Sequence, residues 1–161
     1  MEIDLRPTTT DDLDFVIATE NDPVNRRFVV PWSREQHEIA LQDKNLQHWI
    51  VQGDRPTGYI ILAGLNSPDQ SIEMRRIVIT EKGQGLGRRA IKLTTGHVFD
   101  QLKAHRFWTE VKQFDLRTQH LYKSLGFIEE GRLRDCSKGP EGFETMVLLA
   151  MLQPEYEQIV G

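Results

Sequence analysis

Apolar positions in the first third of the chain follow two periods, which separate short extended stretches from helices. Polar and apolar residues that alternate are typical of a half-buried strand, and apolar residues at helical spacing are typical of an amphipathic helix. Ser33, followed by Glu35, is a helix N-cap signal, and Pro23 stops the helix before it. The elements predicted here are a strand over Glu2–Arg6, a helix from Thr10 to about Asn21, an apolar and basic loop over Asn25–Trp32, and a helix from Ser33 that carries Ile39, Leu41 and Leu46.

From residue 48 the helical period gives way to three extended runs that are rich in β-branched residues. Turn-forming residues separate the runs at 53–56 and at 66–69. Runs that follow one another so closely pair as an antiparallel meander. The predicted strands are His48–Gln52, Thr57–Ala63 and Ile72–Thr80.

The second half of the chain returns to alternating helices and strands after a glycine-rich segment, Lys82–Gly87. The pattern therefore predicts a mixed α+β fold, and the length favours a single domain over residues 1–161. The remaining predicted elements are a helix from about Leu86 to Ala104, a strand over Arg106–Val111, a helix over Leu116–Ser124, and strands over Phe127–Arg132 and Thr145–Leu152.

Composition narrows the class of protein. With 39% hydrophobic and 27% charged residues, the chain has enough apolar surface to fold, which excludes a mainly disordered state. The 20 basic and 24 acidic residues give a net charge of −4, so no positive field favours nucleic acid. One cysteine, Cys136, cannot form an internal disulfide. With neither a signal peptide pattern nor an apolar run long enough to span a membrane, we expect a cytoplasmic protein.

The glycine-rich segment is the most informative stretch of the sequence. Gly83, Gly85 and Gly87 fall between a β-branched strand and a helix, where backbone N–H groups can point together at the helix N-terminus. A simple strand-to-helix turn needs only one glycine, and Arg88 and Arg89 add two cations nearby. The segment therefore predicts a site for a phosphate-bearing ligand.

Two common phosphate-binding motifs compete for this segment. Gly85–Ala90 matches the dinucleotide fingerprint, and Glu110 lies at the distance at which that motif places its acidic residue. That fold needs repeated βαβ units, however, and only one clear unit follows. A P-loop needs Gly-Lys followed by Ser or Thr, whereas Gly87 is followed by Arg88, so triphosphate hydrolysis is excluded.

A second motif, Leu121-Tyr122 followed by Gly126-Phe127, accompanies the loop Lys82–Gly87. With these two motifs the chain resembles the GNAT superfamily of acetyl-CoA-dependent N-acetyltransferases, in particular its diamine-type and ribosomal-protein-alanine-type branch. Lys82 departs from the Arg or Gln that the family carries there. The resemblance implies a mainly antiparallel sheet of about seven strands flanked by about four helices, with the cofactor between two splayed parallel strands.

The resemblance also implies roles for individual residues. Tyr122 would be the general acid that protonates the departing thiolate. From its position on the strand, Glu73 is our candidate for the general base, acting through water, and the alternative is a surface ion pair with Arg75 or Arg76. By strict alternation Glu73 shares a strand face with Arg75, Ile77 and Ile79. The residues expected to bind the cofactor are Ile77, Val78 and Ile79 along the pantetheine, Lys82, Gly83, Gln84, Gly85, Leu86, Gly87 and Arg88 around the pyrophosphate, and Asp115, where the family often has an asparagine.

The implied reaction is direct transfer of acetyl from acetyl-CoA to an amine in a ternary complex. The acceptor stays open between a protein N-terminus, a polyamine and a small amino compound, with Asn25–Trp32 and Arg132–Phe143 expected to line its side of the site. A non-catalytic acyl-CoA-binding or sensing domain is the alternative. The five histidines show no metal-ligand spacing, so we expect no metal. A homodimer is possible in this family, and no membrane or nucleic-acid partner is expected.

Overall fold

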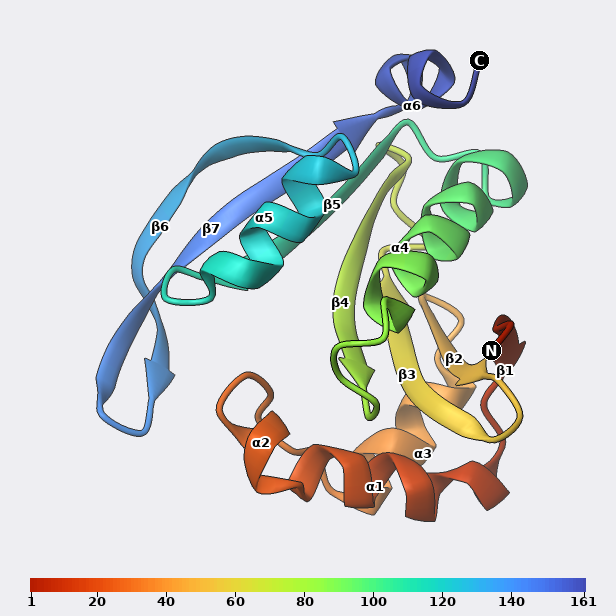
Figure 1. Cartoon of the computed structure of the whole chain (residues 1–161), viewed down its shortest axis with the longest axis vertical. Helices are drawn as coiled ribbons and strands as arrows, with labels where there is room; N and C mark the ends of the chain where they lie inside the picture. Colours follow the sequence, from red (N-terminus) through yellow and green to blue (C-terminus); the bar gives the residue numbers. More distant parts are fainter.

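The computed structural model describes all residues 1–161 and contains one seven-stranded sheet in the order β1-β2-β3-β4-β5-β7-β6 (Figure 1). Every neighbouring pair is antiparallel except β4 and β5, which are parallel. This arrangement confirms the predicted mixed α+β fold. The strands are β1 (Asp4–Pro7), β2 (Leu46–Gln52), β3 (Pro56–Ala63), β4 (Ser71–Ile79), β5 (Arg106–Lys112), β6 (Ile128–Gly139) and β7 (Gly142–Leu152).

Helices cover both faces of the sheet. Successive residues of β3 point to opposite faces, so Ile60 and Leu62 join the larger apolar cluster under α4 and α5, while Tyr59 and Ile61 join a smaller one with Val16 of α1. There are six α-helices where about four were expected. They are α1 (Leu13–Asn21), α2 (Pro23–Arg26), α3 (Arg34–Gln42), α4 (Leu86–Gly96), α5 (Leu116–Ser124) and α6 (Gln153–Val160).

The first half of the chain departs from the predicted boundaries at three points. The loop expected over Asn25–Trp32 begins inside α2, because the Asp22 carboxylate accepts from the N–H of Val24 and caps that short helix. The helix from Ser33 ends at Gln42, so Leu46 belongs to β2 instead. Its apolar Ile39 is exposed, which explains why apolar spacing misplaced the end.

The second half departs from prediction at the ends of its elements. The helix from Leu86 changes to a π-helical turn at 97–101 and stops before Lys103, whose φ of 55° is left-handed. Strands β6 and β7 are longer than predicted, and α6 was not predicted at all. Most residues of β6 are exposed because it is the last strand of the sheet, so its sequence carries little apolar alternation.

Strands β4 and β5 meet at one end and then separate, which gives the sheet the shape of a V (Figure 1). They pair only where Ser71–Glu73 lies beside Arg106–Trp108. Beyond Glu73, β5 has β7 as its only strand neighbour, so the edge of β4 that faces β5 has no strand beside it. This splay of two parallel strands was expected, and it creates the opening in which the site lies.

Candidate functional site

An irregular residue in β4 decides which side chains face the opening. The pairing of β3 with β4 shifts between Ile61, opposite Arg76, and Leu62, opposite Met74, so Arg75 forms a β-bulge. The extra residue reverses the alternation. The expectation that Glu73 shares a face with Ile77 and Ile79 is therefore wrong.

The two faces of β4 beyond the bulge have different surroundings. Ile79 belongs to the apolar cluster under α4 and α5, and Ile77 packs against the same cluster. Val78 belongs to the cluster with α1 on the opposite face. Glu73 lies opposite Ala63 of β3, which has the same parity as Ile61 and Tyr59, so Glu73 is on the face of Val78 and Arg76.

The glycine-rich loop forms an open cradle at the start of α4. Gly83 has φ 77° and Gly85 has φ 72°, a left-handed conformation that other residues adopt only under strain. A Cβ at either glycine would meet no atom within 4 Å, so the backbone faces free space. Gly85 is the N-cap of α4, whose first N–H groups have no partner within the helix. This geometry fits a diphosphate held by backbone N–H groups.

The other predicted cofactor residues surround this cradle. Gln84 is exposed in the loop, while Leu86 is buried and anchors the first turn of α4. Arg88 donates from Nη1 to Oγ of Ser124 at 2.8 Å, which ties α4 to α5. Lys82 has an exposed side chain, and partial desolvation lowers the pKa of its ammonium. Gly87 lies in the first turn of α4, where a Cβ would be 3.9 Å from Leu121 of α5.

Asp115 has a structural task that the sequence did not reveal. Its Oδ1 accepts a hydrogen bond from the N–H of Thr118 at 3.1 Å and so caps α5. Aspartate at a helix N-cap is favourable both for this bond and for the helix dipole. The predicted contact of Asp115 with the cofactor stays a prediction.

Tyr122 of α5 is buried against the point where β4 and β5 separate. Its hydroxyl has no hydrogen-bond partner, and its ring packs edge-on against Phe127 at 5.0 Å. Burial raises the pKa of this hydroxyl, and Thr109 of β5 lies beside it. Thr109 itself donates to the carbonyl oxygen of Met74 at 3.0 Å, which joins β5 to β4. An unpartnered buried hydroxyl is costly, which marks this position for a function.

Two carboxylates lie on the other face at the same point. Glu73 is the last residue of β4 that pairs with β5, and its Oε1 accepts from Arg75 at 3.0 Å. Glu110 follows Trp108, the partner of Glu73, by two residues and therefore shares its face. Burial raises the pKa of Glu110, and the charge of Glu73 raises it further. A carboxyl with a raised pKa beside a second carboxylate is typical of a functional site.

Glu110 is the residue that the sequence analysis missed. There it appeared only as the acidic residue of a dinucleotide motif. Its role here depends on the register of β5 against β4, and three paired residues set that register. An alternation count on β5 alone places Glu110 on the face of Trp108 but does not say which residue of β4 lies opposite.

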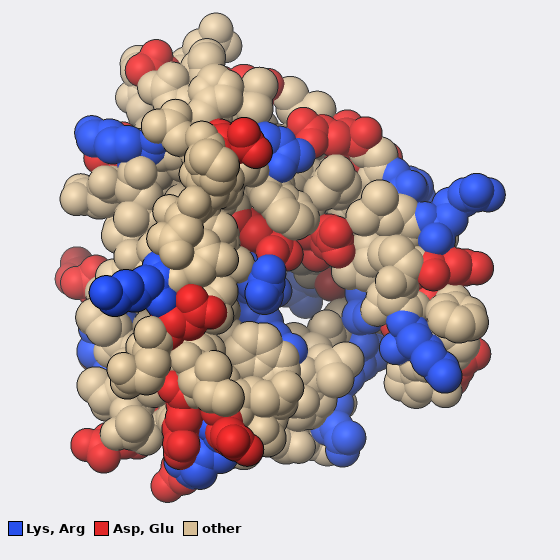
Figure 2. Space-filling view, turned by 180° about the vertical axis from the view of Figure 1, so that it is seen from behind, with Lys and Arg blue, Asp and Glu red and all other residues tan.

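The segment after α2, which we expect to line the acceptor side, lies beside the end of β5. The ring of Phe28 lies 5.9 Å from that of Phe114, which follows β5, and the guanidinium of Arg27 lies 4.8 Å from the Phe114 ring centroid. Seen from behind, the molecule has a hollow with acidic side chains along one rim and basic ones along the other (Figure 2). The range 132–143, also expected here, forms most of the extended β6–β7 hairpin.

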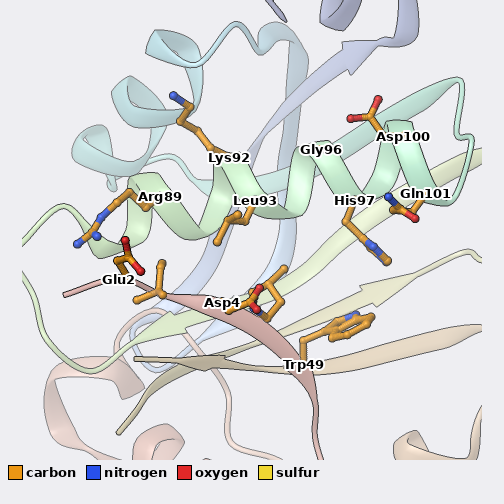
Figure 3. Close-up of a pocket in the computed structure, with 12 residues that line it drawn as sticks. Glu2, Asp4, Trp49, Arg89, Lys92, Leu93, Gly96, His97, Asp100 and Gln101 are labelled. Atoms are coloured by element: carbon orange, nitrogen blue, oxygen red, sulfur yellow. Dashed lines mark hydrogen bonds between the residues drawn. The ribbon is translucent and has the colours of Figure 1, made fainter. Parts of the chain in front are cut away.

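A separate groove of about 830 Å³ lies between α4 and the β1–β2 edge (Figure 3). Trp49 and His97 meet there edge-to-face at 5.1 Å, and charged side chains of both signs surround them. None of the predicted site residues lines this groove. No set of three or more side chains in the structure is arranged to bind a metal ion, and none of its helices has the length and apolar character needed to cross a membrane.

Comparison with known proteins bears on both motifs. A family model described as an acetyltransferase (GNAT) domain matches residues 2–128. The chain is 27% identical over 143 residues to spermidine N(1)-acetyltransferase of Escherichia coli (strain K12), covering 81% of this chain and 75% of that protein. It is 26% identical over 145 residues to the Vibrio cholerae enzyme of the same name, covering 82% of each.

Solved structures agree on the fold. The crystal structure of spermidine N-acetyltransferase from Vibrio cholerae in complex with CoA and spermine superimposes with a TM-score of 0.88 at 22% identity, covering 96% of this chain and 98% of that one. A dodecameric structure of the Vibrio cholerae enzyme has a TM-score of 0.84 at 23% identity, covering 96% and 95% of the two chains. At these identities the likeness establishes the fold.

Proposed function

Because the chain belongs to the GNAT family of acetyltransferases, it takes its acetyl group from acetyl-CoA, and we propose that it transfers this group to a primary amine of a polyamine. The observation that carries the proposal is the pair Glu73 and Glu110 beside the opening of the V. A pair of carboxylates attracts an ammonium group, and a polyamine supplies several. The relatives named spermidine acetyltransferases support the same class of acceptor.

The donor side of the proposal rests on backbone geometry. The N–H groups at Gly83–Gly87 would hold the diphosphate of the coenzyme, with Lys82 and Arg88 close by. The pantetheine arm would run along Ile77–Ile79, where the edge of β4 has no neighbouring strand on the side of β5. Its amides would then bond to the free backbone groups of that edge, as an added strand does. The acetyl end would lie near the start of the splay.

The acceptor amine must lose a proton before it attacks the thioester. We assign Glu73 as the base that takes this proton, through a water molecule, and Glu110 as the second carboxylate that binds the ammonium. Burial raises the pKa of Glu110 and the charge of Glu73 raises it further, so an ammonium group bound beside both carboxylates would relieve their mutual repulsion.

Tyr122 is assigned as the acid that protonates the departing thiolate. Burial raises the pKa of its hydroxyl, so the group keeps its proton at neutral pH. The hydroxyl has no competing hydrogen-bond partner and is free to donate to a sulfur atom. Removing only the hydroxyl, in Tyr122→Phe, should therefore affect the chemical step and leave the coenzyme site intact.

The proposal is tested by initial rates of thiol release with acetyl-CoA and one acceptor at a time. We expect spermidine and spermine to be acetylated with a kcat/KM at least about tenfold above that of a peptide with a free alanine N-terminus. A peptide that is preferred over both polyamines would contradict the proposed acceptor. Coenzyme binding without turnover of any amine would instead support the non-catalytic alternative.

The residue assignments are tested by Tyr122→Phe, Glu73→Gln and Glu110→Gln. Tyr122→Phe and Glu73→Gln are expected to lower kcat about 10²-fold while the affinity for acetyl-CoA changes little, because each removes a group that acts on a proton in transit. Glu110→Gln should instead mainly raise the KM for the polyamine, because it removes a charge that binds the ammonium. Tyr156→Phe is the matched control, since it removes a hydroxyl that bonds Asp100 away from the opening. Unchanged rates in all three variants would remove the assignments.

Assembly and location complete the proposal. One solved relative is dodecameric, and we propose that this chain also associates, with a homodimer as the smallest unit, which light scattering can measure. We place the reaction in the cytoplasm. Cys136 is exposed and unpaired, which suits a reducing compartment.

A further inference from the structure

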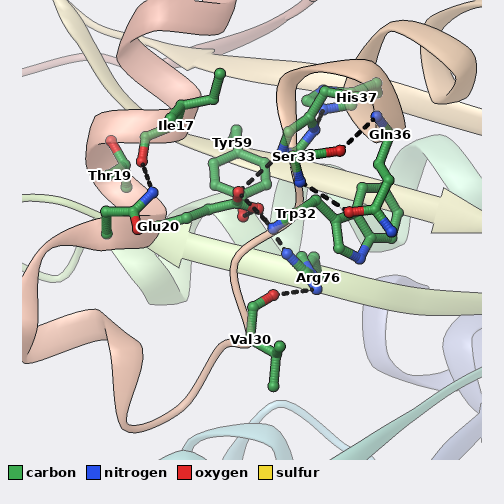
Figure 4. Close-up of polar contacts among 12 residues, drawn as sticks. Ile17, Thr19, Glu20, Val30, Trp32, Ser33, Gln36, His37, Tyr59 and Arg76 are labelled. Carbon is green, nitrogen blue, oxygen red and sulfur yellow. Dashed lines mark hydrogen bonds and ion pairs between the residues drawn. The ribbon is translucent and has the colours of Figure 1, made fainter.

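A charged group is buried on the face of the sheet covered by α1 and α3. Glu20 of α1 is 0% exposed, and four donors surround its carboxylate (Figure 4). Oε1 accepts from the N–H of Trp32 at 3.2 Å and contacts Nε2 of His37 at 2.8 Å. Oε2 accepts from the Tyr59 hydroxyl and from Nη1 of Arg76, each at 2.5 Å. A buried carboxylate is costly unless it is paired in this way.

Arg76 connects this buried group to the segment after α2. Its Nη2 donates to the carbonyl oxygen of Val30 at 2.7 Å, and its guanidinium lies 4.5 Å from the ring centroid of Trp32. Together with the bond from Trp32 N–H to Glu20, these contacts hold both the main chain and a side chain of the segment. We call residues 27–32 the strap.

The strap begins beside the proposed acceptor site and ends on the buried cluster. Arg76 stands one residue after the bulge of β4 and faces the same side as Glu73. At its other end the strap reaches across the opening to Phe114 through Phe28. Phe28 and Val30 are 42% and 69% exposed, so the strap presents apolar surface as well as Arg27. Because the strap borders the opening on the side of the proposed acceptor, a shift of the strap would change the shape of the path by which an acceptor enters.

We propose that Glu20 is a positioning residue for the acceptor: through Arg76 it fixes the strap against β4 beside Glu73 and so sets the affinity for the amine. This inference rests on the proposed function. Glu20 is fully buried, so it offers no surface for a substrate to contact. Its bonds reach the acceptor side through Trp32 and Arg76, whereas neither the loop at 82–87 nor Ile77–Ile79, the proposed donor elements, bonds to it.

The cluster supplies its own control for loss of stability. Tyr59 donates to the same oxygen of Glu20 as Arg76 does, but the Tyr59 hydroxyl makes no bond to the strap. Tyr59→Phe therefore removes one buried hydrogen bond and leaves both strap contacts in place. Glu20→Gln keeps the shape of the side chain and removes the charge that orients Arg76.

The first readout is the separation of the two Michaelis constants. We expect Glu20→Gln and Arg76→Gln to raise the KM for spermidine about tenfold, with the KM for acetyl-CoA within about twofold of wild type. Arg76→Lys should recover part of the loss, because an ammonium keeps the charge but cannot hold both Glu20 and Val30 in a fork. Tyr59→Phe should leave both constants unchanged. A parallel rise of both constants would overturn the inference.

The second readout needs no acceptor. Amide hydrogen exchange is measured on all four variants and wild type, and peptides covering residues 27–32 are compared with peptides from α4. We expect exchange in the strap to rise about tenfold in Glu20→Gln and Arg76→Gln relative to Tyr59→Phe, with α4 unchanged. Equal exchange in Glu20→Gln and Tyr59→Phe would overturn the inference. Lack of turnover in the wild type would refute the proposed function alone.

Discussion

His48 is a buried histidine that contacts the Glu20 cluster through His37, and its burial disfavours the protonated ring. Its Nε2 lies 3.1 Å from Nδ1 of His37, and its Nδ1 lies 2.8 Å from the hydroxyl of Thr8. Burial, followed by the nearby His37, lowers the pKa of His48 from 6.5 to about 4, while Glu20 and Asp12 oppose the shift and Arg76 adds to it. The folded protein therefore holds this ring neutral under conditions in which the unfolded chain protonates it.

This difference makes stability depend on pH. Because the pKa of His48 is lower in the folded state, its contribution is present above pH 6.5 and is lost as the pH falls towards about 4. Between pH 7 and pH 5 we expect the free energy of unfolding to drop by about 2 kcal/mol from this group. Urea denaturation at intervals of half a pH unit measures it.

The matched variant for this measurement is His48→Gln. Glutamine can bond to Thr8 and His37 but does not titrate, so the drop between pH 7 and pH 5 should shrink by most of that amount. Identical slopes for wild type and His48→Gln would assign the pH dependence to other groups. Glu20 is separated from the measurement because its pKa is lowered from 4.5, and it titrates below this range.

At the scale of elements, α6 shows how a helix can exist without a strong pattern in its own sequence. None of its residues is buried, so it has no apolar stripe that a sequence analysis would find. What holds it is Tyr156, whose ring stacks on Phe99 at 4.9 Å and whose hydroxyl donates to Asp100 at 2.7 Å. Ile159 lies close to Gly126, at the end of α5.

Removing that anchor should loosen α6 without affecting catalysis. Tyr156→Ala is expected to lower the free energy of unfolding by about 2 kcal/mol, since it deletes an aromatic stack and leaves a gap. Tyr156→Phe keeps the stack and should cost about 1 kcal/mol or less. Thermal unfolding measures both, and KM values for both substrates should stay at wild-type levels. A larger loss in the phenylalanine variant would show that the hydroxyl, not the ring, holds the helix.

At the scale of the whole molecule, the V has two arms that are joined by few strand contacts. Three residue pairs and the bond from Thr109 to Met74 connect β4 to β5, and Arg88 with Ser124 links the helices above them. A coenzyme that lies in the opening touches both arms. Binding it should therefore stabilise the entire fold.

This stabilisation is measured by thermal unfolding with acetyl-CoA, coenzyme A, NADH and ATP in parallel. At a ligand concentration about 100-fold above Kd, linkage gives about 2.7 kcal/mol, which corresponds to a shift of roughly 5–10 °C for a chain of this size. We expect the shift with acetyl-CoA and coenzyme A. Gly85→Ala, which strains the left-handed loop, should lose most of it. The largest shift with NADH would favour the dinucleotide motif instead.

Several elements were predictable because their signals are local. The helix over Leu116–Ser124 has the predicted bounds, and Ser33 caps its helix as predicted, with Oγ accepting from the N–H of Gln36. The hairpin at 46–63 follows from two β-branched runs with a turn between them. The glycine loop Lys82–Gly87 and the tyrosine motif Leu121–Phe127 are also local signals. Both lie within residues 2–128, which the family model matches.

The sequence and the tertiary structure each determined part of the site. The sequence alone determined the order of most elements, the acetyltransferase family and the open glycine cradle, because each depends on residues that are neighbours along the chain. Only the tertiary structure decided that Glu73 and Glu110 share one face at the start of the splay, that Arg75 reverses the face of β4, and that Glu20 reaches the strap through Arg76. Register, bulges and buried ion pairs join residues distant in sequence, and no local period records such contacts.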